Sequence, residues 1–155
     1  MCSSDCVTAR AWCSERSRVG EAVVTARRRR ILIVDDDPAI CRAYAEILKK
    51  EGYDVITSEG RAEGLAALET VKGAVDLFIV DFGLRDADGP DFARDAVATY
   101  GKRPTLYVSG WTDEFWDMSN APAPWIVLRK PVPVPHLLAT IRWLIEGGPK
   151  PESLR

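Results

Sequence analysis

Four short, mostly apolar runs in this chain are each followed, directly or after one residue, by a side chain that can do chemistry. The runs are Ile31–Val34, Leu77–Val80, Thr105–Val108 and Trp125–Leu128. The side chains that follow them are, in chain order, Asp35, Asp36, Asp37, Asp81, Ser109 and Lys130. If the runs are parallel strands, their carboxyl ends meet at one edge of a sheet, where the ligand sites of open α/β proteins lie.

The chemistry of this set is that of a metal-assisted phosphoryl site. Three or more carboxylates close together repel one another and favour a divalent cation. Hard oxygen ligands suit Mg²⁺ better than zinc. A hydroxyl and an ammonium group opposite the acids would bind the oxygens of an anion, so the set predicts a carboxylate meeting a phosphoryl group beside a metal.

Each of these residues also has an ordinary structural explanation. Asp37 stands before Pro38 and fits a helix N-cap followed by proline at the first helical position. A single Ser109 fits a turn, and a single Lys130 before proline fits the surface. Four such residues at the ends of four strands make the ordinary explanation improbable for the set as a whole.

The elements that must position these residues alternate along the chain. Expected strands cover 31–34, 54–57, 77–80, 105–108 and 125–128. One expected helix begins at Pro38 and is ended by Gly52, and another begins at Pro90. Two more are expected over 60–71 and 134–146, and a short, poor helix over 112–118. The helix 60–71 is expected to turn Ala62, Leu65, Ala66 and Leu68 inward, and the apolar strands are expected to be buried on both faces. This is a (βα)5 pattern, which predicts an α/β doubly wound five-stranded parallel sheet.

Composition narrows the classes of function. The 155 residues are 46% hydrophobic and 28% charged, with a net charge of −2 and four cysteines. These values exclude a disulfide scaffold and give no general case for nucleic-acid binding. No apolar run approaches the roughly 20 residues of a membrane span, so we expect no membrane segment and a cytoplasmic protein.

Residues 1–30 differ from the rest, with seven arginines, no lysine and three acids. Four explanations remain open: a disordered basic extension, a true start further downstream, contact with an anionic surface through Arg27–Arg30, or an export signal, which the lack of an apolar core disfavours. We expect the extension to end at residue 30, a single domain over 31–147, and a polar tail over 148–155.

The segments ILIVDDDP (31–38), DLFIVDFGLRDADG (76–89), TLYVSGW (105–111) and VLRKP (127–131) together resemble the response-regulator receiver domain of two-component signalling. The resemblance covers about residues 31–147. It implies a flavodoxin-like sheet with strand order 2-1-3-4-5, and a cis peptide between Lys130 and Pro131.

The resemblance also implies a role for each site residue. Asp81 is the phosphoacceptor, Asp35 and Asp36 are the acidic pair that binds Mg²⁺, and Gly83 offers a backbone carbonyl to the metal. Ser109 and Lys130 bind the phosphoryl group. The implied function is a phosphorelay receiver, a phosphoacceptor rather than an enzyme, fed by a sensor histidine kinase or phosphotransfer protein.

Three features depart from the family pattern. Val127 stands where an aromatic switch residue is usual, with Trp125 two residues earlier. Arg85 replaces a usual proline, and two prolines make the loop 111–124 a poor fourth helix. Gly83 and Trp111 hold the positions that flank the path of attacking water, and a shielding Trp111 would prolong the life of the acyl phosphate.

The sequence leaves the downstream target open. Only seven residues follow Gly148, too few for a DNA-binding output domain, so we expect a protein partner or a phosphate sink. The kinase, the stimulus and the oligomeric state are not predicted. The rivals are a haloacid-dehalogenase-type phosphatase with Asp35 as nucleophile, a pseudo-receiver without phosphorylation, and a nucleic-acid binder acting through the basic extension.

Overall fold

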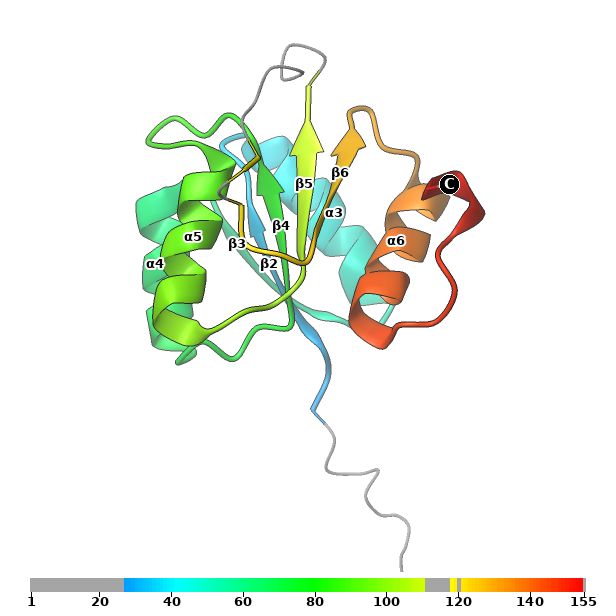
Figure 1. The fold of residues 1–155 in the computed structure, drawn as a ribbon, viewed down its shortest axis with the longest axis horizontal. Helices are drawn as coiled ribbons and strands as arrows, with labels where there is room; N and C mark the ends of the chain where they lie inside the picture. Colours follow the sequence, from blue (N-terminus) through cyan, green and yellow to red (C-terminus); the bar gives the residue numbers. More distant parts are fainter. Residues whose placement is uncertain (1–26, 111–117, 120, 155) are drawn as a thin grey trace, which may run out of the picture.

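Five parallel strands form a single sheet in the structure, a computed structural model that describes residues 27–110, 118–119 and 121–154 (Figure 1). The strands are β2 (Arg30–Val34), β3 (Asp54–Ser58), β4 (Leu77–Asp81), β5 (Thr105–Ser109) and β6 (Trp125–Arg129). Their spatial order is β3-β2-β4-β5-β6, with every neighbouring pair parallel. In chain order this is 2-1-3-4-5, as predicted.

Within the described part of the chain, four α-helices cover the two faces of the sheet. They are α3 (Pro38–Lys50), α4 (Arg61–Thr70), α5 (Gly89–Tyr100) and α6 (Val134–Glu146), and a 3-10 turn, η2 (Glu152–Leu154), follows. Figure 1 shows α4 and α5 on one face, and α3 and α6 on the other. The helix expected over 112–118 falls almost entirely outside the described residues.

Alternation along the central strands builds two separate cores. Ile31 and Ile33 of β2 pack into the cluster that holds α3 and α6 side chains, while Leu32 and Val34 pack into the cluster of α4 and α5. Successive side chains of a strand point to opposite faces, so a strand that is covered on both sides must be apolar throughout. The continuous apolar run that predicted β2 therefore has a direct structural cause.

The start of α3 confirms its predicted cap. The Asp37 carboxylate accepts a hydrogen bond from the Ala39 backbone N–H at 2.9 Å, and Pro38 occupies the first turn. This cap fixes where the chain leaves β2 and turns into the helix, and it therefore fixes the backbone at Asp35 and Asp36.

The buried face of α4 differs from the prediction. Gly64 and Leu68 are its buried residues, whereas Ala62 and Ala66 are exposed. Leu65 is only partly buried. A Cβ built on Gly64 would lie 2.8 Å from the ring of Phe92 on α5, so α4 turns its glycine to a close helix contact. A prediction based only on the spacing of aliphatic side chains cannot identify a buried helix face that is built around a glycine.

The expectation that the apolar strands are buried on both faces is wrong for β6. Trp125 is 40% exposed and Val127 is 36% exposed. This strand lies at the sheet edge, and its Ile126 and Leu128 face the cluster of α6. Among the described residues, no helix covers the opposite face of β6.

The described residues include no helix with the length and apolarity needed to cross a bilayer.

Candidate functional site

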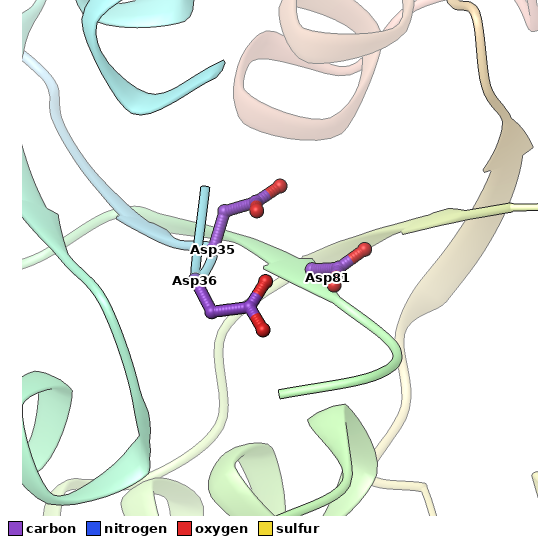
Figure 2. A group of neighbouring side chains, drawn as sticks. All are labelled: Asp35, Asp36 and Asp81. Carbon is purple, nitrogen blue, oxygen red and sulfur yellow. The ribbon is translucent and has the colours of Figure 1, made fainter. Parts of the chain in front are cut away.

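Three carboxylates converge at the carboxyl edge of the sheet (Figure 2). Asp35 directly follows β2, Asp36 is next to it, and Asp81 is the last residue of the adjacent strand β4. Each offers an oxygen within 4.8 Å of the others. Asp35 and Asp81 are buried, and Asp36 is partly open to solvent. The structure thus brings together the acids that the sequence pattern selected.

Lys130 reaches this cluster from the end of β6. Its Nζ lies 2.8 Å from Asp81 Oδ1 and 3.3 Å from Asp35 Oδ2. Its backbone N–H donates to the carbonyl of Ser109 at 2.7 Å, and its peptide bond to Pro131 is cis, as the resemblance implied. The ammonium group therefore bridges two of the three carboxylates.

Ser109 ends β5, the strand that pairs with β4. Asp81 stands opposite Val108 in this pairing, so Ser109 is one residue beyond the partner of Asp81. Ser109 is buried. Its position at the same edge as Asp81 and Lys130 matches the prediction, and its proposed contact with a phosphoryl group stays a prediction.

The loop after Asp81 folds back tightly on the strand end. Gly83 lies exposed in this loop and forms an antiparallel bridge with Asp88. A Cβ on Gly89 would lie 2.5 Å from the carbonyl oxygen of Asp81, and the Gly89 N–H donates to Phe82 at 2.8 Å. Only glycine allows α5 to begin this close to Asp81. The metal-binding role of the Gly83 carbonyl stays a prediction.

Burial and charge shift the titration of all three central groups. Burial raises the pKa of Asp35, opposed by the Asp37 N–H and by Lys130. Burial also raises the pKa of Asp81, helped by the charge of Asp35 and opposed by the hydrogen bond from Lys130. For Lys130, burial lowers the pKa, but the hydrogen bond that its ammonium group donates to Asp81 and the charges of the nearby carboxylates outweigh burial, so the pKa is raised overall. A partly buried cluster with excess negative charge suits a cation.

Comparisons with known proteins agree with this arrangement. The family model described as response regulator receiver domain matches residues 31–142. The chain belongs to this family. A solved receiver domain protein of Methanospirillum hungatei JF-1 is 30% identical, covers 77% of this chain and 95% of its own, and has a TM-score of 0.67.

Curated relatives of this receiver domain are longer proteins. Sensor kinase CckA of Brucella abortus is 26% identical over 85% of this chain and 15% of its own length. Transcriptional regulatory protein TrcR of Mycobacterium tuberculosis is 27% identical over 81% of this chain and 51% of its own length. The chain thus spans about half or less of these relatives, and the likeness concerns the receiver part.

Two loop residues of this receiver were not assigned to the site from sequence. Arg85 donates from Nη2 to the Asp36 carbonyl at 3.3 Å, and its Nε lies 3.9 Å from Asp36 Oδ2. Asp86 accepts hydrogen bonds from the backbone N–H groups of Arg61 and Ala62 at 2.9 and 3.1 Å. The Asp-rich loop was visible in the sequence, but its partners are more than 20 residues away. Trp111 lies outside the described residues.

Proposed function

We propose that this receiver domain accepts a phosphoryl group on Asp81 from a sensor histidine kinase or a phosphotransfer protein. The observation that carries this proposal is the contact of Lys130 Nζ with Asp81 Oδ1 at 2.8 Å, beside two further carboxylates. A buried acid between a cation and other acids, at a strand end, is a frequent arrangement in functional sites.

The donor set fits Mg²⁺. Asp35, Asp36 and Asp81 offer hard carboxylate oxygens within 4.8 Å, and the partial exposure of Asp36 leaves room for water ligands. Bound there, Mg²⁺ would neutralise the charge that develops on the phosphoryl oxygens. Gly83 follows in the adjacent loop, and we assign its carbonyl to the same ion.

The residues of the chain itself divide the transfer between them. An oxygen of Asp81 forms a bond to phosphorus while the phosphorus–nitrogen bond of the donor phosphohistidine breaks and its electron pair leaves with the imidazole. Lys130 holds Asp81 in position and then balances the added charge of the acyl phosphate. Ser109 accommodates a phosphoryl oxygen from the neighbouring strand, which couples the modification to β5.

The output in this proposal is a change of binding to a protein partner, or storage of phosphate in a relay. The chain is then a phosphoacceptor that assists its own modification, and a DNA-binding output is not required of these residues. The phosphatase alternative, with Asp35 as nucleophile, leaves the Asp81–Lys130 contact without a role.

Intact-mass spectrometry after incubation with acetyl phosphate and Mg²⁺ tests the proposal. We expect one added phosphoryl group, located on Asp81, that is absent without Mg²⁺ and absent in Asp81→Asn. Asp91→Asn, on the nearby helix α5, is the matched control and should be modified like the wild type. Modification of Asp81→Asn to the same extent contradicts the assignment, and continuous hydrolysis of phosphate esters favours the phosphatase.

A further inference from the structure

The three carboxylates of the site are balanced by two different cations. Lys130 forms ion pairs with Asp35 and Asp81 on the buried side of the cluster, and its side chain is 26% exposed. Arg85 pairs with Asp36 on the solvent side, where its Nε lies 3.9 Å from Asp36 Oδ2 and its side chain is 74% exposed. Asp36 is the most open of the three acids, so a metal ion arriving from solvent meets Arg85 first.

We propose that Arg85 competes with Mg²⁺ for Asp36 and so sets the metal affinity of the site. This inference rests on the proposed function, because it concerns the same metal. A carboxylate that binds a cation must turn its oxygens to that ion, and a guanidinium beside those oxygens opposes the approach of a second positive charge. Arg85 therefore positions the Asp36 carboxylate when no metal is bound.

The two cations differ in how easily they can leave. Lys130 contacts two carboxylates and is largely enclosed, so it remains when the ion enters. The Arg85 side chain is mostly in water, and an exposed pair of this kind gains little free energy. Arg85 can move into solvent at small cost, which gives competition with Mg²⁺ rather than a permanent block.

The loop that carries Arg85 is anchored on its far side. The adjacent Asp86 carboxylate binds the first backbone N–H groups of α4, which has no cap from its own N-cap residue, Gly60. A Cβ on Gly60 would lie 2.8 Å from Asp86 Oδ1, so glycine makes room for this contact. The anchor holds the backbone of the loop where the Arg85 side chain reaches Asp36.

Calorimetric titration of Mg²⁺ into the full chain at low ionic strength tests the competition. We expect Arg85→Gln to bind Mg²⁺ about three- to tenfold more tightly than the wild type, the range for one partly screened charge. Arg85→Lys keeps the charge and should stay within about twofold of the wild type. The difference between wild type and Arg85→Gln should shrink at roughly 1 M salt, where exposed charges are screened.

Arg142→Gln is the matched control, because Arg142 is also an exposed arginine paired with a carboxylate, that of Glu51 beyond the far end of α3. It should leave the Mg²⁺ affinity unchanged. Equal or weaker binding by Arg85→Gln overturns the inference, as does an Arg85→Lys variant that binds as tightly as Arg85→Gln. If Asp36→Asn still abolishes binding in that case, the proposed metal site survives alone. A wild type that binds no Mg²⁺ overturns both.

Discussion

At the scale of single residues, the site is a balance between burial and charge. Asp81 and Asp35 share one ammonium group, and burial raises the pKa of both carboxyls. A carboxyl whose pKa is raised in the folded state stabilises the fold only below its unfolded pKa, and this contribution is lost as the pH rises through the folded pKa. Without metal, the two acids therefore cost stability at neutral pH.

This balance predicts the effect of Asp81→Asn on stability. Without metal at pH 7, we expect the free energy of unfolding to rise by up to about 2 kcal/mol, since one buried charge is removed while Lys130 keeps Asp35 as its partner. The gain should fade as the pH falls through the raised pKa of the wild-type Asp81 carboxyl, and should be gone below about pH 4, the pKa of an Asp in the unfolded chain. Urea unfolding of both proteins across this range measures it. If the stability difference between Asp81→Asn and the wild type is smaller at pH 7 than at pH 4, the predicted sign is contradicted.

The charge of the site also affects the ionisation of Cys41, a residue that takes no part in the proposed reaction. Its thiol is buried under β2 and lies 3.3 Å from the Asp35 carbonyl. Burial and the charge of Asp35 raise its pKa to about 11. At pH 8 roughly one thiol in a thousand is then ionised.

We therefore expect Cys41 to resist iodoacetamide in the native protein at pH 8, with a rate at least about a hundredfold below that in denaturant. Peptide mass spectrometry of native and unfolded samples gives the two rates for the same residue. Rapid labelling of Cys41 in the native state would show that α3 opens away from the sheet.

At the scale of elements, the sequence predicted what depends on periodicity and missed what depends on distant partners. The runs before Asp35, Asp81, Ser109 and Lys130 predicted strands and their common edge, because a strand covered on both faces must be apolar. The buried face of α4 was missed, since its contact with Phe92 requires a glycine, Gly64, rather than an aliphatic side chain.

The exposure of the edge strand and the contacts between loops were missed. The strand order implied by the family resemblance placed β6 at the edge, but the apolar residues of this strand still predicted burial on both faces, and Trp125 is exposed. The ion pair of Arg85 with Asp36 joins two loops 49 residues apart, and no spacing rule links them. The cis peptide before Pro131 was predicted only through the family resemblance.

The cap that Asp86 provides for α4 gives a prediction for an element. We expect Asp86→Ala to lower the free energy of unfolding by about 1 kcal/mol at pH 7, the usual cost of losing an N-terminal cap. The Arg61 and Ala62 N–H groups lower the pKa of Asp86, so its contribution is present above about pH 4 and is lost as the pH falls further. Chemical denaturation at pH 7 and pH 3 measures both values, and Asp86→Asn, which keeps an acceptor, is the control. An equal loss at both pH values would mean that the charged cap is not the cause.

At the scale of the whole molecule, the site joins strands from both halves of the chain. Asp35 and Asp36 follow the first strand, Asp81 ends the third, and Lys130 follows the last. The cluster forms only when β2, β4 and β6 are all in their places. A ligand of this cluster therefore binds the folded chain and not the unfolded one, which links occupancy of the site to global stability.

The last prediction follows from this linkage. Mg²⁺ at ten times its dissociation constant should raise the free energy of unfolding by about 1.4 kcal/mol. For a chain of this size that corresponds to a rise of about 3–6 °C in the melting temperature. Asp36→Asn should abolish the rise, because Asp36 is the acid most open to an ion from solvent, whereas Asp88→Asn, in the loop that follows Asp81, should preserve it. Thermal melts in a series of MgCl₂ concentrations, with NaCl at matched ionic strength, separate binding from screening. A melting temperature that responds equally to both salts would mean that the three carboxylates do not form a metal site.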